Sequence, residues 1–586
     1  MGWRFDTVIS CYIIFLPFLI FSILSFLGLY SKIILNVTKY IIISLFSLAF
    51  FICAVDIPFF NYYFSRLNVI IFSWTKNASF GFKMVIQEKT YLVYFFIFIV
   101  LNIIYIAIFR LIKIEPFKKG NGISNRIFHL FLSIIVLGVI FIGIRGRIEK
   151  KSPIRVGTAY FSNYSFINQL GLNPVFTLVQ SFIESKNEVN NQIKLIDDRE
   201  AIKLVNSYLK INNSEIPFVR DIKPNCTQIK PNIVLILMES MSAKKMKRYG
   251  NDLNITPFLD SISQLGYNFE QCYSAGIHTF NGIYSTLFSY PSILKKHTMN
   301  LTEIPQYTGF ASTLSDLGYN TIYFTTHDEQ FDNVSGFLHA NGFKKIISQK
   351  DYPSKAILST LGVPDHYMFE FSLPELNNLA KENKPFFSVF LTSSDHGPYI
   401  VPDDIPFKPK NKDIKNAIVE YADWSLKHFM VLCSNEKWFS NTIFIFTADH
   451  GSIFDNSIYD IPLSYNHIPF IIYSPEIIKS PKSIDTPCGQ IDIFPTLMGI
   501  LGIKYINNTA GVDVFNEPRP FMYFCADDKI GCIDNQYFYL YRVVNNTESL
   551  YKWKDNDTKD YINELKAKRD SMKKYSFSML QASQWM

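Results

Sequence analysis

The first quarter of the chain consists of long apolar runs separated by short polar loops. Four stretches of at least 18 residues are apolar and almost free of charge, at residues 7–30, 33–60, 90–109 and 127–144. A helix of about 20 apolar residues spans the hydrocarbon core of a bilayer. The pattern therefore predicts a transmembrane α-helical bundle over residues 1–147.

Residues 67–87 leave open whether this bundle has four helices or five. The stretch contains Phe72 and Trp74 but also Lys76 and Lys83, so it suits either a fifth span or a segment at the membrane surface. A fifth span would place the N-terminus in the cytoplasm, and a surface segment would place it outside.

Basic residues predict the orientation of the bundle. The loop at residues 110–126 holds five Lys or Arg against one Glu, and the positive-inside rule makes such a loop cytoplasmic. The next span then leaves the cytoplasm. The chain after about residue 150 is therefore expected on the outer side with either number of helices.

Farther along, short apolar runs alternate with helical patterns. Runs rich in Ile, Val, Leu and Phe, typical of buried parallel strands, lie at residues 232–238, 321–325, 386–392, 442–447 and 469–473. Helical patterns lie at residues 257–265, 282–287, 311–317, 374–381, 416–433 and 493–501. This alternation predicts an α/β sandwich with a mostly parallel sheet.

Polar segments mark the limits of this second domain. Residues 148–225 are polar and Asn-rich, and we interpret them as a linker with one or two helices before a catalytic domain over residues 226–545. Aromatic runs after about residue 520 predict a few antiparallel strands. A polar helix is expected near residues 556–573, in a C-terminal helical tail at residues 546–586.

The balance of basic and acidic residues differs between the membrane part and the rest of the chain. Residues 1–150 carry 15 Lys and Arg against 5 Asp and Glu, whereas residues 151–586 carry 42 against 45. The basic balance therefore belongs to the membrane part alone. The larger part is not expected to bind nucleic acid, because such proteins present a basic surface.

Acidic and histidine residues follow several of the predicted strands. Glu239 follows the first strand, Asp449 and His450 follow another, and His327 and His396 follow two more. The carboxyl ends of parallel strands meet at one edge of a sheet, where sites form. Two carboxylates and an imidazole suit one divalent metal ion, Mn²⁺ or Zn²⁺, better than Mg²⁺.

Thr279 is the candidate reactive group beside this metal. It follows an apolar run and stands where a helix is expected to begin, close to backbone N–H groups that favour an anion such as phosphate. A neighbouring metal ion would make its hydroxyl a better nucleophile. From spacing alone, Thr279 could equally be the N-cap of that helix.

Four motifs resemble the alkaline phosphatase/sulfatase superfamily. They are the strand that ends in Glu239, the T-P-x-L-D helix start at residues 256–260, the D-H-G motif at residues 449–451 and the D-I-x-P-T-L helix at residues 492–497. Together they cover about residues 220–505 in the superfamily's order. Its sulfatases need a C-x-P-x-R sequence that this chain lacks, which disfavours sulfate-ester hydrolysis.

Membrane spans ahead of such a domain are similar to those of lipoteichoic acid synthases and of lipid A phosphoethanolamine transferases. The resemblance implies a multi-pass protein of the bacterial cell (inner) membrane with an extracytoplasmic or periplasmic catalytic domain. In both branches a threonine nucleophile shares one metal with Glu, Asp and His. Thr279, Glu239, Asp449 and His450 match these four positions, so the resemblance makes Thr279 the catalytic residue.

The implied reaction moves a phospholipid headgroup through a phospho-threonine intermediate. The donor would be phosphatidylglycerol or phosphatidylethanolamine, and the acceptor an envelope glycan or lipid. The resemblance also assigns substrate binding to four residues, His327, Asp332, His396 and His467.

The transferred headgroup stays open, with phosphoglycerol favoured. Asn333 stands where the phosphoglycerol branch has an arginine that clamps a phosphate, and the cysteine-flanked threonine motif of the phosphoethanolamine branch is missing as well. Phosphoethanolamine transfer and a phosphodiesterase with water as acceptor remain alternatives. An inactive scaffold is disfavoured, because all four metal-site positions are kept.

Overall fold

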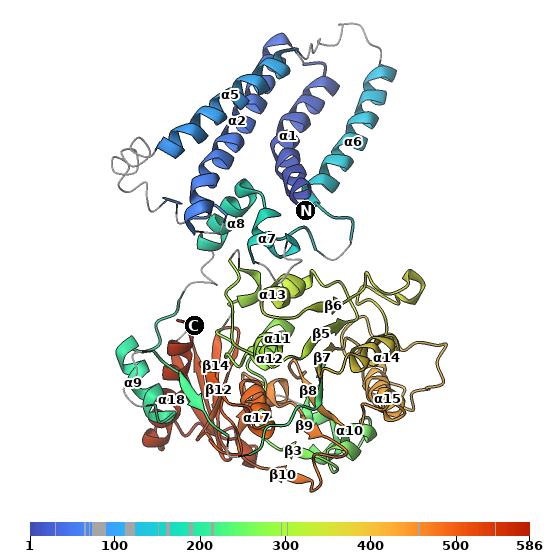
Figure 1. Cartoon of the computed structure of the whole chain (residues 1–586), viewed down its shortest axis with the longest axis vertical. Helices are drawn as coiled ribbons and strands as arrows, with labels where there is room; N and C mark the ends of the chain where they lie inside the picture. Colours follow the sequence, from blue (N-terminus) through green and yellow to red (C-terminus); the bar gives the residue numbers. More distant parts are fainter. Residues whose placement is uncertain are drawn as a thin grey trace. The chain divides into compact units, whose positions relative to one another are not determined.

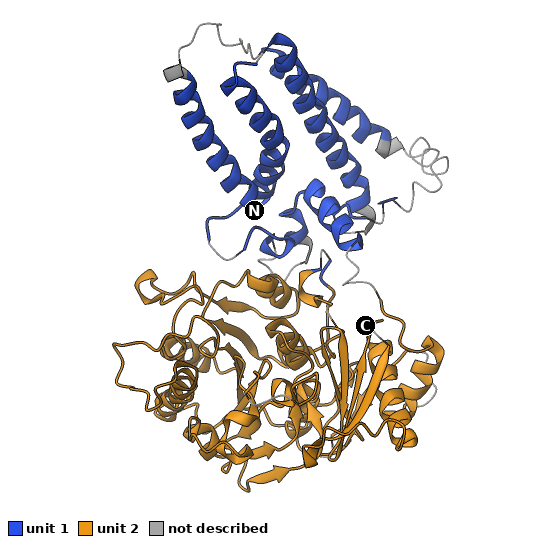
Figure 2. Cartoon of the chain, turned by 180° about the vertical axis from the view of Figure 1, so that it is seen from behind, with its two compact units in different colours: residues 1–188, 301–304 blue, residues 189–300, 305–586 orange. Residues whose placement is uncertain are grey.

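The computed structural model of this 586-residue chain describes residues 1–29, 31–63, 66–69, 71–72, 89–111, 123–149, 152–159, 165–186, 192–211, 216–224, 226–294, 296–301, 303–454, 458–544 and 546–585. The chain divides into two compact units, drawn in different colours in Figure 2. The first comprises Met1–Glu188 with Leu301–Ile304, and the second comprises Val189–Asn300 with Pro305–Met586.

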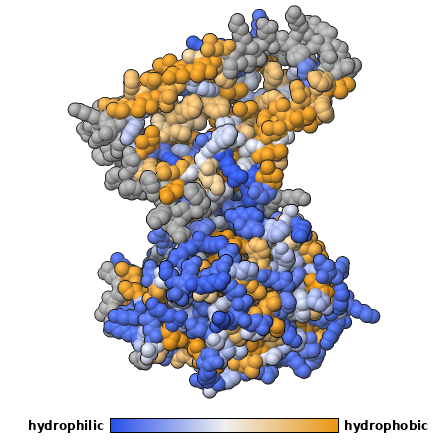
Figure 3. Space-filling model, turned by 45° about the vertical axis from the view of Figure 1, so that its right-hand side comes forward, coloured by the Kyte–Doolittle hydropathy of each residue, from blue (hydrophilic) through white to orange (hydrophobic). Residues whose placement is uncertain are grey.

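Within the described residues, four helices of the first unit are long and apolar enough to cross a membrane. They are α1 (Gly2–Phe26), α2 (Lys32–Tyr63), α5 (Lys89–Leu111) and α6 (Ile123–Arg145). Each coincides with one predicted apolar run, so the sequence prediction of four apolar helices is confirmed. Hydrophobic side chains gather over these helices (Figure 3), as expected for surfaces that face lipid. The undecided stretch at residues 67–87 falls mostly outside the described residues.

The segment interpreted as a linker contains helices that belong to different units. α7 (Ser165–Leu170) and α8 (Pro174–Lys186) lie in the first unit, and α9 (Asp198–Tyr208) lies in the second. The linker boundaries at residues 148 and 225 stay predictions.

An eight-stranded sheet forms the centre of the second unit (Figure 1). Its order across the sheet is β10 (Lys482–Ile484), β3 (Tyr267–Phe269), β9 (Phe470–Tyr473), β8 (Thr442–Ala448), β2 (Asn232–Met238), β7 (Phe386–Leu391), β5 (Asn320–Thr325) and β6 (Lys345–Ile347). Among these strands only β9 runs opposite to the others. The mostly parallel sheet predicted from the sequence is therefore confirmed.

Further helices of the second unit follow α9 along the chain, and several of them cover the large sheet. They are α10 (Pro257–Ile262), α11 (Thr279–Phe288), α12 (Phe310–Asp316), α13 (Val334–Ala340), α14 (Asp365–Lys381), α15 (Ile414–Ser434), α16 (Leu463–Asn466), α17 (Ile493–Ile500) and α18 (Lys566–Ser583).

One face of the sheet packs against α10, α14 and α15. Phe390 of β7 and Phe446 of β8 both stand opposite Ile236 of β2, so they point to the same face. Phe390 contacts Phe369 of α14 at 5.3 Å between ring centroids, and α10 and α15 add aromatic contacts to the same two strands.

The other face packs against α12 and α17. Phe387, three positions before Phe390 on β7, points to this side and stacks on Phe310 of α12 at 5.1 Å. Phe310 in turn meets Phe494 of α17. Because both faces are covered, every residue of β2 is buried, which explains why the strand is an unbroken apolar run.

A second, antiparallel sheet follows near the C-terminus. It consists of β13 (Met522–Ala526), β14 (Lys529–Ile533), β15 (Tyr537–Arg542) and β16 (Thr547–Lys552) in sequential order. Two short pairs complete the fold, β1 (Arg220–Ile222) with β12 (Tyr505–Asn507), and β4 (Cys272–Tyr273) with β11 (Cys488–Gly489).

Two predicted helices differ from the structure in their limits by many residues. The helix expected near residues 556–573 is α18, which spans Lys566–Ser583, because Met572, Tyr575 and Met579 are buried and extend its packed face. The helix expected at residues 374–381 is the second half of α14, which begins at Asp365 and contains Pro374.

Candidate active site

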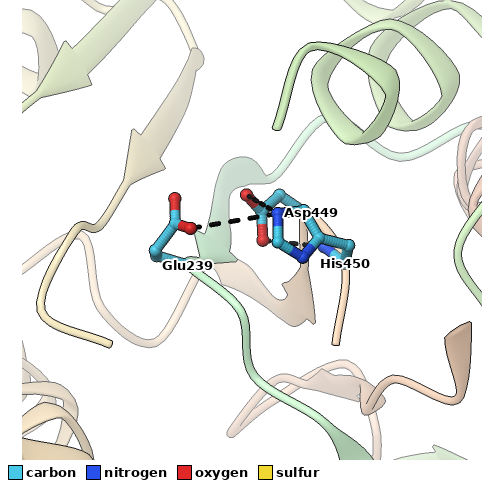
Figure 4. A group of neighbouring side chains, drawn as sticks. All are labelled: Glu239, Asp449 and His450. Atoms are coloured by element: carbon cyan, nitrogen blue, oxygen red, sulfur yellow. Dashed lines mark hydrogen bonds and ion pairs between the residues drawn. The ribbon is translucent and has the colours of Figure 1, made fainter. Parts of the chain in front are cut away.

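The ends of two neighbouring strands bring the predicted metal ligands together. Met238 of β2 pairs with Ala448 of β8, so the next residues, Glu239 and Asp449, leave the sheet side by side. With His450 they form a buried group whose ligand atoms all lie within 4.8 Å of one another. Figure 4 shows the three side chains converging on the space between them. The sequence placed these residues at the strand ends, and the structure places them in one cluster.

The hydrogen bonds around Asp449 leave one carboxylate oxygen free for a metal. Asp449 Oδ1 accepts from the backbone N–H groups of Ser240 at 2.8 Å and of His450 at 2.7 Å. Its Oδ2 is buried and has no hydrogen-bond partner among the described residues. A buried carboxylate oxygen without a partner is costly unless a cation meets it.

His450 presents its second ring nitrogen to the carboxylates. Its Nδ1 lies 2.7 Å from the carbonyl oxygen of Gly451, which can only accept a hydrogen bond, so Nδ1 carries the proton. Nε2 then faces the cluster with its lone pair, 3.5 Å from Asp449 Oδ2 and 3.9 Å from Glu239 Oε1. A backbone carbonyl that fixes the tautomer in this way is typical of histidine metal ligands.

The electrostatics of the cluster also call for a cation. Burial raises the pKa of Glu239 well above its usual range, and the negative charge of Asp449 raises it further. Two adjacent buried carboxylates and an imidazole lone pair repel one another unless positive charge lies between them. Glu239, Asp449 and His450 therefore fit a divalent metal ion.

Thr279 reaches the cluster from the first turn of α11. Its Oγ1 lies 3.5 Å from Glu239 Oε2. The helix begins at Thr279 and its N-cap is His278, so the alternative in which Thr279 is the N-cap is wrong. A Cβ on Gly282 would lie 2.2 Å from the backbone oxygen of Asp449, so only a glycine lets α11 come this close.

Two amide side chains that sequence reasoning missed hold the segment before Thr279. Gln490 donates to the backbone oxygens of Ala448 and Asp449 at 2.8 and 2.7 Å, and accepts from Ala275 N at 2.9 Å. Asn466 donates to Ser274 O at 3.2 Å. These bonds tie the threonine segment to the end of β8. Gln490 lies two residues before the D-I-x-P-T-L motif, which was its only local signal.

A buried ion pair beside the cluster was also missed. Lys245 donates to the carboxylate of Asp395 and to the backbone oxygen of Ser240 at 3.0 Å. Burial raises the pKa of Asp395, and the ammonium group of Lys245 opposes that rise. The pair joins the loop after β2 to the loop after β7. Nothing in the local sequence around Lys245 indicates this contact.

Two of the predicted substrate-binding histidines lie in strand-end loops. His327 follows β5 and is buried, with Nδ1 3.1 Å from the hydroxyl of Thr325 and its ring against Phe331. His396 follows β7 and is exposed, with Nδ1 2.7 Å from the carbonyl oxygen of Gly397.

Asp332 connects to α11 through an aromatic stack. Its Oδ1 lies 3.4 Å from Nε2 of His297, and His297 stacks on Phe280 at 3.8 Å between centroids. Phe280 also stacks with His278, whose Nε2 is 2.9 Å from Asp527 Oδ1. His278 and Phe280, the chain neighbours of Thr279, are therefore held by contacts that lead to Asp527 and Asp332.

His467 is held in the packing near β4. Its Nε2 lies 2.9 Å from the carbonyl oxygen of Glu270, and its ring contacts Tyr249 and Tyr273. Burial lowers the pKa of His467 to about 4, so the ring is neutral at pH 7. The metal group does not include it, and its role in substrate binding stays a prediction.

Comparison with known sequences finds a family model that matches this part of the chain. Residues 231–503 match the Sulfatase family model. This segment is similar to the domain that the family model describes. It contains the eight-stranded sheet and all four predicted metal-site residues.

The curated relatives include both synthases and sulfatases. The lipoteichoic acid synthase-like YvgJ of Bacillus subtilis is 24% identical over 345 residues, 54% of this chain and 54% of that protein. The lipoteichoic acid synthase of Staphylococcus saprophyticus is 24% identical over 356 residues, 54% of this chain and 52% of that protein. The ulvan-active sulfatase of Formosa agariphila is 25% identical over 312 residues, 49% of this chain and 58% of that protein. The chain thus spans about half the length of the curated relatives it matches.

Solved structures show the fold. An alkaline phosphatase superfamily protein from Vibrio parahaemolyticus aligns with a TM-score of 0.60 at 24% identity, over 66% of this chain and 96% of that one. The lipoteichoic acid synthase LtaP from Listeria monocytogenes aligns with a TM-score of 0.52 at 21% identity, over 65% of this chain and 97% of that one. The alkaline phosphatase/sulfatase-like fold predicted from the motifs is therefore confirmed.

Proposed function

We propose that this protein is a membrane-bound, metal-dependent phosphotransferase that moves a phospholipid headgroup to an acceptor of the cell envelope. The observation that supports this most directly is the position of Thr279. Its hydroxyl lies 3.5 Å from Glu239 in the first turn of a helix, beside Asp449 and His450. A hydroxyl nucleophile, an anion-favouring helix start and a metal-binding group thus meet in one place.

The proposed reaction has two displacements at phosphorus. Thr279 gives up its proton, and its Oγ forms a bond to the phosphorus of the donor lipid as the bond to the diacylglycerol oxygen breaks. Diacylglycerol leaves with a proton, and the headgroup phosphate stays on Thr279 as an ester. An acceptor hydroxyl then attacks the same phosphorus and restores Thr279. A divalent ion, Mn²⁺ or Zn²⁺, held by the three ligands would supply charge that stabilises the phosphoryl oxygens.

The remaining side chains would bind the substrate. We assign phosphate or headgroup contacts to His327, Asp332, His396 and His467, as the sequence motifs imply. His396 is the most accessible of the four, because it is exposed in the loop after β7.

The similarity to lipoteichoic acid synthases favours phosphoglycerol from phosphatidylglycerol as the transferred group. Phosphoethanolamine from phosphatidylethanolamine is the second candidate, and one observation supports it. Asn333, which stands in place of a phosphate-clamping arginine, is 2% exposed and donates to Met299 O at 2.6 Å. Its amide nitrogen is therefore engaged in the protein interior, and its buried oxygen cannot donate to a second phosphate.

The four apolar helices support the proposed compartment and acceptor. With four spans and a cytoplasmic loop between α5 and α6, the catalytic domain would lie on the extracytoplasmic side of a bacterial cell membrane. An envelope glycan or lipid would then be the acceptor. Sulfate-ester hydrolysis is disfavoured, because the reactive position holds Thr279 and not a cysteine or serine in a C-x-P-x-R sequence.

Diacylglycerol release tests the proposal. The full-length protein is incubated with Mn²⁺ in vesicles of phosphatidylglycerol or of phosphatidylethanolamine. We expect Thr279→Ala to lower the rate by roughly 10³-fold or more, as for loss of a catalytic nucleophile, and the matched Thr279→Ser to retain part of it. Release by Thr279→Ala at the wild-type rate would overturn the proposal. Free headgroup phosphate formed without any acceptor would identify a hydrolase instead.

A further inference from the structure

The two short helices of the first unit, α7 and α8, expose several large apolar side chains and bury several polar ones. On α8, Thr177 and Ser181 are buried, whereas Val179, Phe182 and Ile183 are 51%, 45% and 57% exposed. A helix that faced water would show the reverse pattern.

α7 shows the same pattern of buried polar and exposed apolar side chains. Asn168 and Gln169 are 1% and 6% exposed, whereas Ile167 and Leu170 are 40% and 51% exposed. Two consecutive helices with inverted faces are characteristic of segments whose surroundings are apolar.

The polar inner face is fixed by specific hydrogen bonds. Thr177 donates to the carbonyl oxygen of Leu67 at 2.9 Å, and the hydroxyl of Ser181 accepts from Val69 N at 2.9 Å. The carbonyl oxygen of Gln169 accepts from the guanidinium of Arg66 at 2.9 Å. These bonds hold both helices against the segment that follows α2, so neither can roll over to bury its apolar side.

Contacts with α1 place α8 at the end of a membrane span. Phe176 meets Phe5 edge to face at 5.0 Å, and Asn173 donates to Asp6 Oδ1 at 2.8 Å. Trp3, in the same first turn of α1, is 85% exposed. Tryptophan gathers where lipid headgroups meet hydrocarbon, so this turn, and α8 with it, lies at the level of the bilayer surface.

We propose that the outer face of α7 and α8, made of Ile167, Leu170, Val179, Phe182 and Ile183, lies in the interfacial layer of the bilayer that the four helices cross. Its partner is the phospholipid leaflet itself. The face continues the lipid-facing surface of α1 and α2, which contact α8. Lys186, 5.7 Å above the ring of Phe182, ends the apolar stripe with an ammonium group that can reach the headgroups.

This inference does not depend on the proposed chemistry. It rests on the membrane spans and on the inverted faces, and it would hold for a protein with a different reaction. Two other occupants could cover the same face, namely residues 73–88 of this chain or a second copy, and both are outcomes of the test.

Photolabelling from the lipid and from water tests the inference. The full-length protein is placed in nanodiscs of phosphatidylglycerol and phosphatidylethanolamine that contain a phospholipid with a diazirine on its acyl chain. A parallel sample receives a water-soluble diazirine. We expect lipid adducts on Val179, Phe182 and Ile183 at yields close to those on Phe96 of α5, which is 66% exposed, and few adducts from water.

Three results would overturn the inference. Labelling of α8 only by the water-soluble reagent would show a face in water. Labelling by neither reagent would show a face covered by protein. Cross-links from α8 to residues 73–88 or to a second copy would identify that cover.

A pair of variants shows whether a change in lipid labelling comes from the apolar face and not from misfolding. Phe182→Gln with Ile183→Gln should lower lipid adducts on α8 several-fold and leave those on α5 unchanged. The matched control Glu184→Gln, on the flank of α8, should change neither. Unchanged lipid adducts on α8 in the double variant would contradict the inference.

Discussion

Asp449 combines two tasks in a single carboxylate. Oδ1 is engaged with the backbone N–H groups of Ser240 and His450, and Oδ2 is left without a partner. The two N–H groups fix the plane of the carboxylate, and this plane sets the direction of Oδ2. Nε2 of His450 lies 3.5 Å from this unpaired oxygen and 3.9 Å from Oε1 of Glu239.

Asp449→Asn tests the role of the carboxylate in metal binding without removing its structural hydrogen bonds. The amide oxygen can still accept from both N–H groups, but the charge and the free oxygen are lost. We expect the affinity for Mn²⁺ or Zn²⁺ to fall by about 100-fold or more, since even outer residues around a metal typically contribute 10–100-fold. Calorimetric titration of the chelator-stripped protein measures this.

The matched control is Asp423→Asn. Asp423 is also buried, but it accepts from Phe258 N and Leu259 N at the start of α10. This change should leave metal affinity unaltered. Equal metal affinity in Asp449→Asn and the wild type would remove Asp449 from the metal site.

At the scale of elements, an aspartate at the start of α14 holds the loop after β7 in place. Asp365, the first residue of that helix, accepts from Ser393 N at 2.9 Å and from Ser394 N at 3.3 Å. Burial raises the pKa of Asp365 to about 6. The clamp thus fixes the loop that carries Asp395 and the exposed His396.

Asp365 predicts a specific pH dependence of stability. Its folded pKa of about 6 lies above the ordinary 3.8, so the folded state binds the proton more tightly. The resulting stabilisation is complete below about pH 4 and is lost as the pH rises through 6. We expect the free energy of unfolding of the wild type to fall by about 3 kcal/mol relative to Asp365→Asn over this window.

Thermal unfolding of both metal-free proteins in detergent between pH 4 and pH 7 measures the difference. Curves that stay parallel across this range would contradict the shifted pKa of Asp365.

Strands were easier to predict than helix limits, for physical reasons. β2 was predicted with its observed limits, because a strand covered on both faces must be apolar throughout. The start of α14 was missed because Pro374 favours the first turn of a helix. In the structure, the packing of Phe369 on Phe390 and Phe429 stabilises the turns before that proline.

The metal ligands were predictable because they follow strands. Glu239, Asp449 and His450 follow β2 and β8, and the edge where parallel strands end is a known location for ligands. Gln490 and Lys245 come from segments with no such position. Their roles depend on tertiary contacts with Asp449 and Asp395, which no local pattern encodes.

At the scale of the second unit, one arginine joins the C-terminal elements to the large sheet. Arg519 is 6% exposed and binds the carboxylate of Asp492, next to α17, and the hydroxyl of Tyr575 on α18 at 2.9 Å. Asp492 also accepts from Gly489 N and Val512 N. The aspartate of the D-I-x-P-T-L motif is therefore a structural anchor.

Arg519→Met should destabilise the protein strongly. It leaves the carboxylate of Asp492 buried without its counter-charge, which typically costs about 3–5 kcal/mol. Tyr575→Phe removes only one hydrogen bond from the same group and should cost about 1 kcal/mol. Urea unfolding followed by tryptophan fluorescence compares the two, and equal losses would argue against a charge role for Arg519.

At the scale of the whole molecule, the proposed reaction needs the four apolar helices to hold the chain in the membrane and Thr279 to react beside the predicted metal ligands. Peptide mass spectrometry after incubation with mixed phospholipids and Mn²⁺ or Zn²⁺ is the most direct test. We expect a phosphoglycerol adduct on Thr279, absent from Thr279→Ala. A phosphoethanolamine adduct would select the second headgroup. Intact lipid and unmodified Thr279 in the metal-loaded protein would contradict the account.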